Sequence, residues 1–152
     1  MSGLEFKSTS RWRVSGEYNP AVLIRALKLI VPPQSSSILH LEGVGSSPEL
    51  LRWIEQHEVP NAPRVRPGTL WPKATQHAIH LTDSVSDWAA QFLETHAAPE
   101  FCIHLHLSSD GELLMTGYDF GASTLELNTS IPESQVAAFA ATIGCSYCKE
   151  EH

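Results

Sequence analysis

Histidine recurs in a pattern that could bring several imidazoles together. Three apolar stretches carry the tripeptide aliphatic-His-Leu, namely Leu39-His40-Leu41, Ile79-His80-Leu81 and Ile103-His104-Leu105, and His106 follows the last of them. Neutral imidazole is a common ligand of zinc and other divalent ions, and two histidines at positions i and i+2 of a strand can chelate. The candidate metal ligands are therefore His40, His80, His104 and His106, with zinc as the candidate ion.

The same histidines have two other interpretations. A sheet with one face towards water exposes polar residues there, and histidines on such a face serve packing or contact with a protein partner. We favour this structural interpretation over a metal site. Acid–base catalysis ranks last, because the sequence places no serine or cysteine beside these histidines and no clearly convergent pair of carboxylates. The sequence predicts no catalytic residue and favours a protein that is not an enzyme.

A second partial motif lies near the C-terminal end of the sequence. Cys145 and Cys148 form a C-x-x-C, and His152 follows four residues later. The attacking cysteine of a thiol–disulfide enzyme sits at a helix N-terminus, where the helix dipole lowers its pKa, whereas this pair follows Gly144 at a predicted helix C-terminus. A redox role is therefore disfavoured. A zinc site in this tail would need a fourth ligand.

Charge is divided unevenly along the chain. Residues 1–76 hold nine Lys and Arg against six Asp and Glu, whereas residues 77–152 hold Lys149 alone against eleven acids, for a net charge of −7. If the acidic elements share a face, that face repels nucleic acid and attracts a basic protein; otherwise the acids serve solubility. The candidate partner-binding residues are Asp110, Glu112, Asp119 and Glu126, together with Trp71 in a proline-rich loop.

A faint repeat of about forty residues indicates how the histidines are positioned. The segment from Leu39 to Pro60 is echoed by the segment from Ile79 to Pro99, and both end in aromatic-aliphatic-Glu-x-His-x-x-Pro. Each copy is typical of a strand followed by a helix. Neighbouring side chains of a strand point to opposite faces, so each strand separates its aliphatic residues from its histidine. If these strands are neighbours, the sheet has an aliphatic face under the helices and an open histidine-rich face.

The remaining segments complete a predicted order of βαβαβαβββα. Strands are expected at 4–14, 38–42, 77–82, 100–107, 112–119 and 124–128, and helices at 20–31, 47–57, 86–97 and 131–144. The first three strands are each followed by a helix, which favours parallel pairing early and antiparallel pairing late. We therefore predict a single α/β or α+β domain over residues 1–152, with a mixed sheet, helices mainly on one face, an irregular loop at 60–72 and a tail at 145–152.

Other features exclude whole classes of protein. The sequence has no run of eighteen apolar residues and no basic-then-apolar start, and it has three cysteines, an odd number. We therefore expect a cytoplasmic protein that is neither membrane-spanning nor held by disulfides. Nucleic-acid binding is not expected. The hypothesis is a non-enzymatic acidic protein-binding module, such as an inhibitor or immunity-type antagonist of a basic toxin or enzyme, without a cofactor. The alternative is a metal-binding protein or metal-dependent enzyme that uses the histidine face.

Overall fold

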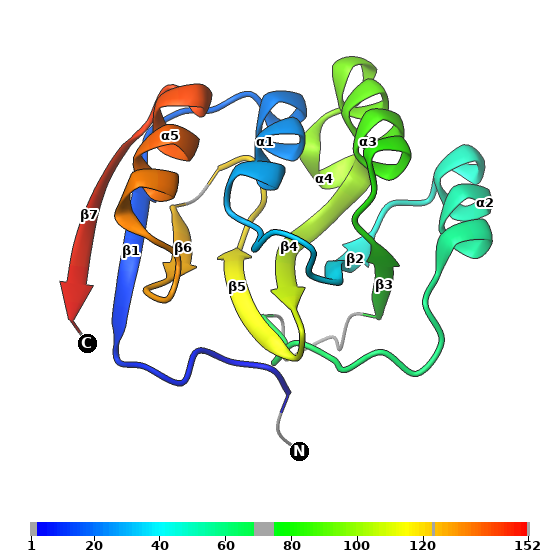
Figure 1. The fold of residues 1–152 in the computed structure, drawn as a ribbon. Helices are drawn as coiled ribbons and strands as arrows, with labels where there is room; N and C mark the ends of the chain where they lie inside the picture. Colours follow the sequence, from blue (N-terminus) through cyan, green and yellow to red (C-terminus); the bar gives the residue numbers. More distant parts are fainter. Residues whose placement is uncertain (1–2, 69–74, 123, 152) are drawn as a thin grey trace.

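The three strands that carry the histidine pattern are neighbours in the structure. The computed structural model describes residues 3–68, 75–122 and 124–151. In these ranges one seven-stranded sheet has the order β3 (Gln76–His80), β2 (Ser37–Val44), β4 (Cys102–Ser109), β5 (Glu112–Gly117), β6 (Leu125–Asn128), β1 (Ser10–Ser15) and β7 (Ser146–Glu151) (Figure 1). The predicted α+β class is confirmed. The adjacency of β3, β2 and β4 also places the three histidine tripeptides side by side.

The predicted parallel pairing of the early strands is wrong. Every pair of neighbouring strands in the described ranges is antiparallel, including β2 and β3. After α2 (Pro48–His57) the chain passes along the outer side of β3. There the Val59 amide donates to the Ala78 carbonyl over 2.7 Å, and Glu58 forms an isolated β-bridge with Ile79. The chain then turns back, and β3 inserts between this short segment and β2. The loop that follows Pro60 thus reverses the strand direction that a direct crossover would have given.

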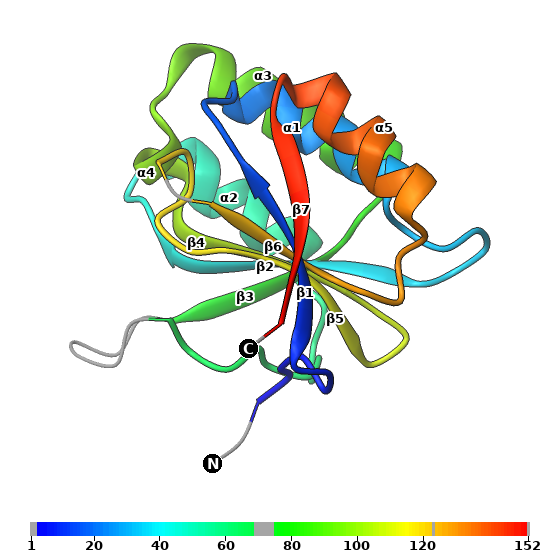
Figure 2. The same cartoon turned by 90° about the vertical axis from the view of Figure 1, so that its left-hand side faces the viewer.

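The helices gather on one side of the sheet, as predicted (Figure 2). They are α1 (Pro20–Ala26), α2, α3 (Asp83–Thr95), the short α4 (Ala98–Phe101) and α5 (Glu133–Ile143), and α1 continues into a turn of 3₁₀ helix, η1 (Leu27–Leu29). Their apolar sides cover most of the aliphatic neighbours of the histidines, although Ile103 is exposed. Leu39, Leu41, Ile79, Leu105 and Leu107 are all fully buried there.

Capping residues explain where several elements begin and end. The Asn19 Oδ1 accepts hydrogen bonds from the amides of Ala21 and Val22, and Pro20 occupies the first turn of α1. At the other end of the chain, α5 stops at Gly144, whose φ of 74° lies in the left-handed region. The predicted Asp-Gly turn between β4 and β5 is confirmed, because Asp110 and Gly111 both have positive φ, 51° and 80°.

Residues 146–151 form the edge strand β7, although we predicted a tail. The strand pairs with β1 along its whole length, from Ser10 opposite Glu151 to Ser15 opposite Ser146. Tyr147 packs edge-on against Trp12 with ring centroids 6.0 Å apart. β7 is an edge strand and is mostly exposed. Its sequence therefore lacks the alternation of apolar and polar residues from which a strand is predicted. None of the helices in the described residues is long and apolar enough to cross a membrane.

Candidate ligand-binding pocket

The strand register aligns polar side chains across the sheet on the face away from the helices. His40 on β2 lies opposite His106 on β4, and His106 lies opposite Thr116 on β5. The row continues from Thr116 to Glu126 on β6 and from Glu126 to Arg13 on β1. The predicted separation of histidines from aliphatic residues is therefore confirmed, and the row extends across five strands.

Two diagonal hydrogen bonds join β2 to β4 within this polar face. The Nε2 of His40 is hydrogen-bonded to the Ser108 hydroxyl over 2.8 Å, and the Nε2 of His106 is bonded to Oε1 of Glu42 over 3.1 Å. All four side chains are buried. The expectation of an open histidine face is therefore wrong at the centre of the sheet.

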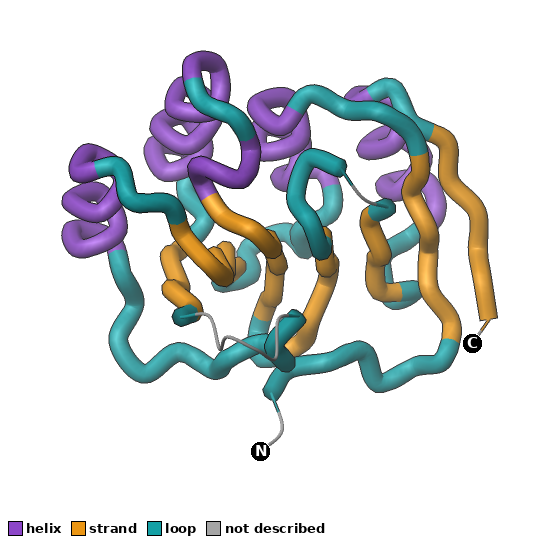
Figure 3. The backbone as a smooth tube through the Cα atoms, turned by 180° about the vertical axis from the view of Figure 1, so that it is seen from behind, coloured by secondary structure: helices purple, strands orange, loops and turns teal. Residues whose placement is uncertain are grey.

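Two irregular segments cover this part of the face. Residues 3–6 and 62–68 lie on the side of the sheet away from the helices (Figures 2 and 3) and are joined to each other, since the Leu4 amide donates to the Arg64 carbonyl and the Arg66 amide donates to the Leu4 carbonyl. The Gly68 amide donates to both oxygens of Glu42, over 3.0 and 3.1 Å. The buried carboxylate thus holds the loop against the sheet.

Burial controls the charge of the central histidines. The pKa of His40 is lowered to about 4, chiefly by burial and secondly by the charge of the nearby His106. Burial likewise lowers the pKa of His106, although the hydrogen bond and charge of Glu42 act in the opposite direction. Both rings are therefore neutral at pH 7. Since the Glu42 carboxylate accepts from the His106 Nε2, the Nδ1 of His106 is the acceptor nitrogen of that ring.

The four predicted metal ligands are not brought together as a metal site. His80 is exposed at the end of the edge strand β3, and the His104 Nδ1 accepts from the Asp119 amide over 2.9 Å. Across the described ranges, no group of three or more His, Cys, Asp or Glu is placed to hold a metal ion. His80 lies opposite Ile38 and not opposite another histidine, and His104 is bonded to the Asp119 amide, so the strand register pairs only His40 with His106. For the predicted tail site, Cys148 is exposed on β7, and His152 lies outside the described residues.

The contact between Ser108 and His40 carries no signal in the sequence. A serine bonded to a neutral histidine is the pair used for nucleophilic catalysis. Here, however, Ser108 is only 3% exposed, and a small pocket of about 180 Å³ beside β3 is lined by His40 but not by Ser108. The pair satisfies two buried polar groups. It was not predictable because the contact depends on the register between β2 and β4.

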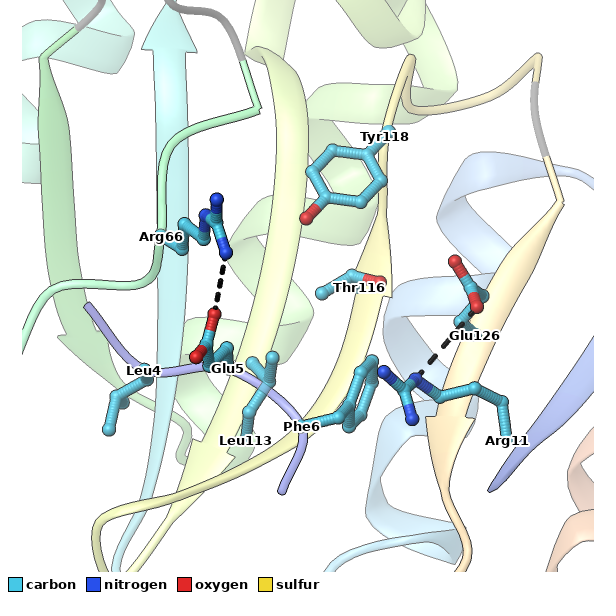
Figure 4. Close-up of a pocket in the computed structure, with 9 residues that line it drawn as sticks. All are labelled: Leu4, Glu5, Phe6, Arg11, Arg66, Leu113, Thr116, Tyr118 and Glu126. Carbon is cyan, nitrogen blue, oxygen red and sulfur yellow. Dashed lines mark hydrogen bonds and ion pairs between the residues drawn. The ribbon is translucent and has the colours of Figure 1, made fainter. Parts of the chain in front are cut away.

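A larger pocket of about 400 Å³ opens over β5 and β6 (Figure 4). Thr116 lies between two ion pairs, Arg66–Glu5 at 2.9 Å and Arg11–Glu126 at 4.0 Å. The other lining residues are Leu4, Phe6, Leu113 and Tyr118. The pocket therefore combines both signs of charge with hydroxyl groups and apolar side chains.

Thr116 and Tyr118 supply the neutral polar groups of this pocket. Thr116 is 2% exposed, and its hydroxyl has no hydrogen-bond partner within the described part of the chain, nor has the Nδ1 of the adjacent His106. Burial first, and the charge of Glu42 second, raise the pKa of Tyr118, so the phenol keeps its proton at pH 7. The Tyr118 ring packs edge-on against both His104 and His106, with centroids 5.4 Å apart in each case. The buried histidines thus support one wall of the pocket.

The predicted partner-binding acids do not form one patch. Asp110 and the exposed Glu112 lie at the β4–β5 turn, whereas Asp119 follows the opposite end of β5. Glu126 lines the pocket beside Arg11. Trp71 lies outside the described residues.

The division of charge along the sequence is not a division in space. Basic residues of the first half pair with acids of the second half, in Arg11–Glu126, Arg13–Glu150 and Arg25–Asp87. The reason is the strand order, because β1 lies between β6 and β7.

Most residues of the pocket carry no signal in the sequence. Glu5, Phe6 and Arg66 come from irregular segments, which no periodicity connects to β5. Thr116 and Tyr118 do carry one signal: they alternate with Met115 and Gly117 on a predicted strand next to the one with His104 and His106. Polar residues at alternate positions of adjacent strands predict a shared face.

Comparisons with protein-family models, with curated proteins and with solved structures each found no match to this chain.

Proposed function

We propose that this protein is a non-enzymatic binding protein and that the pocket over β5 and β6 takes a small polar ligand. The observation that carries the proposal is that Thr116, a residue of the pocket wall, has a buried hydroxyl without a hydrogen-bond partner among the described residues. A buried polar group without a hydrogen bond costs roughly 1–3 kcal/mol. A ligand that hydrogen-bonds to this hydroxyl recovers that cost, which favours binding.

The charged side chains that line the pocket can exchange their ion-pair partners for charged groups of a ligand. The side chains of Arg66 and Glu5 are 70% and 56% exposed, and the Arg11–Glu126 contact is long at 4.0 Å. Ion pairs of this kind contribute roughly 0–1 kcal/mol to stability. Opening the exposed Arg66–Glu5 pair to contact a ligand therefore costs the fold little.

Binding is favoured over acid–base catalysis by the state of the nearby titratable groups. The Tyr118 phenol, with its raised pKa, keeps its proton at pH 7 and can serve as a hydrogen-bond donor. The neutral His40 and His106 are buried beneath the face and bonded to Ser108 and Glu42. These groups orient the pocket walls and are not placed to exchange protons with a ligand.

Thermal-shift measurements with carboxylic acids, phosphate esters, amines and amino acids test the proposal. We expect at least one of these classes to stabilise the wild-type protein and the Thr142→Val control, in which a helical hydroxyl bonded to the Ala138 carbonyl is removed instead. Thr116→Val, which keeps the shape and removes the hydroxyl, should weaken the same ligand about tenfold, the value of one lost hydrogen bond. Absence of stabilisation by every class, or equal affinity in both variants, contradicts the proposal.

A second proposal is docking onto a basic protein, as an inhibitor or immunity-type antagonist would. It is favoured by the position of Asp110 and Glu112, which are exposed at the tip of the β4–β5 hairpin. Reversing both charges to Lys should weaken low-salt binding of poly-L-lysine more than reversal of the exposed helical acids Glu55 and Glu94 does. Equal loss in the two double variants would show that only net charge matters and would remove this proposal.

A further inference from the structure

We infer that the ligand of the pocket over β5 and β6 is a zwitterion, of the class of α-amino acids and short peptides; the inference rests on the proposed function. The pocket carries one guanidinium and one carboxylate on each of two sides, Arg66 with Glu5 and Arg11 with Glu126, and Thr116 lies between them (Figure 4). A ligand at Thr116 therefore meets both signs of charge.

The balance of charge disfavours a ligand of a single sign. An anion that binds Arg66 or Arg11 separates that arginine from its carboxylate partner and then lies close to this carboxylate, which repels it. A cation that binds Glu5 or Glu126 lies close to the separated arginine and is repelled in the same way. Like charges brought together in this way reduce affinity. A zwitterion meets one member of each pair, because its carboxylate takes the place of one acidic side chain and its ammonium takes the place of one arginine, and it adds no net charge to the pocket.

The hydroxyl groups indicate which end of the ligand lies where. The Tyr118 ring extends towards the side of the pocket that holds Arg66, and Thr116 lies below it (Figure 4). The Arg66 guanidinium and the Tyr118 phenol together form a donor-rich site for a carboxylate. The ammonium group is then directed to Glu126 on the other side. Arg11 already lies 4.4 Å from the centre of the Phe6 ring, so it keeps a contact when Glu126 turns to the ligand.

Size and apolar lining restrict the ligand further. A volume of about 400 Å³ lies at the lower end of the range for small-molecule sites. Leu4, Phe6 and Leu113 provide apolar surface beside the charged groups. We therefore expect an aliphatic or aromatic side chain on an amino acid or dipeptide.

Matched probes separate the charge requirements. Ligand-observed NMR would compare three sets of compounds: the free amino acids and dipeptides with aliphatic or aromatic side chains, their N-acetyl forms, which lack the ammonium, and their amides, which lack the carboxylate. We expect a free form to bind and both blocked forms to bind at least tenfold more weakly. Phosphate esters, simple carboxylic acids and amines are run in parallel as single-charge ligands.

Two variants assign the charges to residues. Glu126→Gln should reduce the preference for the free form over the N-acetyl form, and Arg66→Gln should reduce the preference over the amide, each by about tenfold. Glu94→Gln and Arg52→Gln, which change exposed helical charges, serve as controls and should leave both ratios unchanged. The readout is the ratio of the affinities for free and blocked compounds, measured on each folded variant. A general loss of stability would lower both affinities and would not change this ratio.

The outcomes distinguish this inference from the proposed function. If a blocked or single-charge compound binds as tightly as any free form, and Thr116→Val weakens it, the zwitterion is wrong and the binding pocket stands. If no compound of any set binds, both are wrong. If free forms bind equally well to wild type, Glu126→Gln and Arg66→Gln, the assignment of the charged groups is wrong.

Discussion

His40 and His106 lie opposite each other on β2 and β4, and burial keeps both neutral. Each ring bonds diagonally to the other strand, one to Ser108 and one to Glu42. A pair of facing imidazoles is tolerated in the interior because neither carries a charge at pH 7 and both are hydrogen-bonded. Residues that the sequence offers as metal ligands therefore serve as uncharged polar packing.

Protonation of His40 should destabilise the fold in mild acid. Its pKa is about 4 when folded against an ordinary value of 6.5, so the unfolded chain binds the proton first as the pH falls. The contribution is complete above pH 6.5 and is lost between pH 6.5 and 4, by roughly 3 kcal/mol at 1.36 kcal/mol per pKa unit. Urea unfolding across this pH range measures the effect.

The variant that isolates this contribution is His40→Gln, which retains an amide able to bond Ser108 but does not titrate. Its stability should depend less steeply on pH between 6.5 and 4 than that of the wild type. His80→Gln, at an exposed position, should leave the slope unchanged. Parallel pH profiles for wild type and His40→Gln would show that His40 is not the group responsible.

The Glu42 side chain should contribute more to the free energy of unfolding than any exposed acidic side chain does. The carboxylate is buried and accepts hydrogen bonds from the Gly68 amide and from His106. Glu42→Gln removes the charge from these bonds, and we expect a loss of about 2 kcal/mol in the free energy of unfolding, with faster hydrogen exchange of the Gly68 amide. Glu55→Gln, on an exposed position of α2, should change stability by less than about 0.5 kcal/mol. A similar value for both variants would refute the role of Glu42 as a loop anchor.

At the scale of the element, the repeat ends in a common helix terminus. The Nδ1 of His57 is bonded to the Trp53 carbonyl over 2.8 Å, and the Nδ1 of His96 is bonded to the Phe92 carbonyl over 2.9 Å. Both histidines thus bond to the carbonyl four residues earlier, at the end of α2 and of α3. The recurring aromatic-x-x-x-His spacing is explained by this cap.

The two caps should differ in strength. The His96 ring stacks on Phe92 with centroids 3.9 Å apart and an interplanar angle of 1°, whereas His57 and Trp53 are 5.5 Å apart and tilted by 39°. Alanine at either position removes one hydrogen bond, and alanine at position 96 also removes the stacking. We expect His96→Ala to cost about 1–2 kcal/mol and His57→Ala about half as much in thermal or urea unfolding. The reverse order would show that stacking does not contribute.

At the scale of the whole molecule, the fold distributes charge that the sequence segregates. Arg11 and Arg13 on β1 meet Glu126 on β6 and Glu150 on β7, and the Arg25 guanidinium contacts Asp87 on α3. The pair formed by Arg13 raises the pKa of its guanidinium, chiefly through the hydrogen bond to Glu150. The acidic half is thus partly neutralised by arginines of the basic half.

Salt should have little effect on the stability of this molecule. The ion pairs between the two halves are largely at the surface, where each contributes under about 1 kcal/mol, and screening also relieves repulsion from the net charge of −7. Between about 0.05 and 0.5 M NaCl, over which the Debye length falls several-fold, the free energy of unfolding should change by less than about 1 kcal/mol. A fall of several kcal/mol would show that these pairs support the fold.

Local patterns in the sequence predicted most of the helices and strands and the faces of their side chains, although they missed β7. Alternation assigned Leu39 and Leu41 to the core and His40 to the opposite face, and Asn19 and Gly144 marked helix ends, because these signals depend only on local geometry. The adjacency of the three histidine strands did not follow from the sequence, because the repeat covers two of them and specifies no pairing; it is a finding of the structure.

Only the tertiary structure decided strand direction, the burial of the histidine face and the pocket. The return of the chain after Pro60 made β3 antiparallel, and the same loop, together with residues 3–6, covered Glu42 and His106. Thr116 meets Glu5 and Arg66 in one pocket although they come from separate parts of the chain. Such contacts depend on the register and on the path of irregular segments, which no local periodicity encodes.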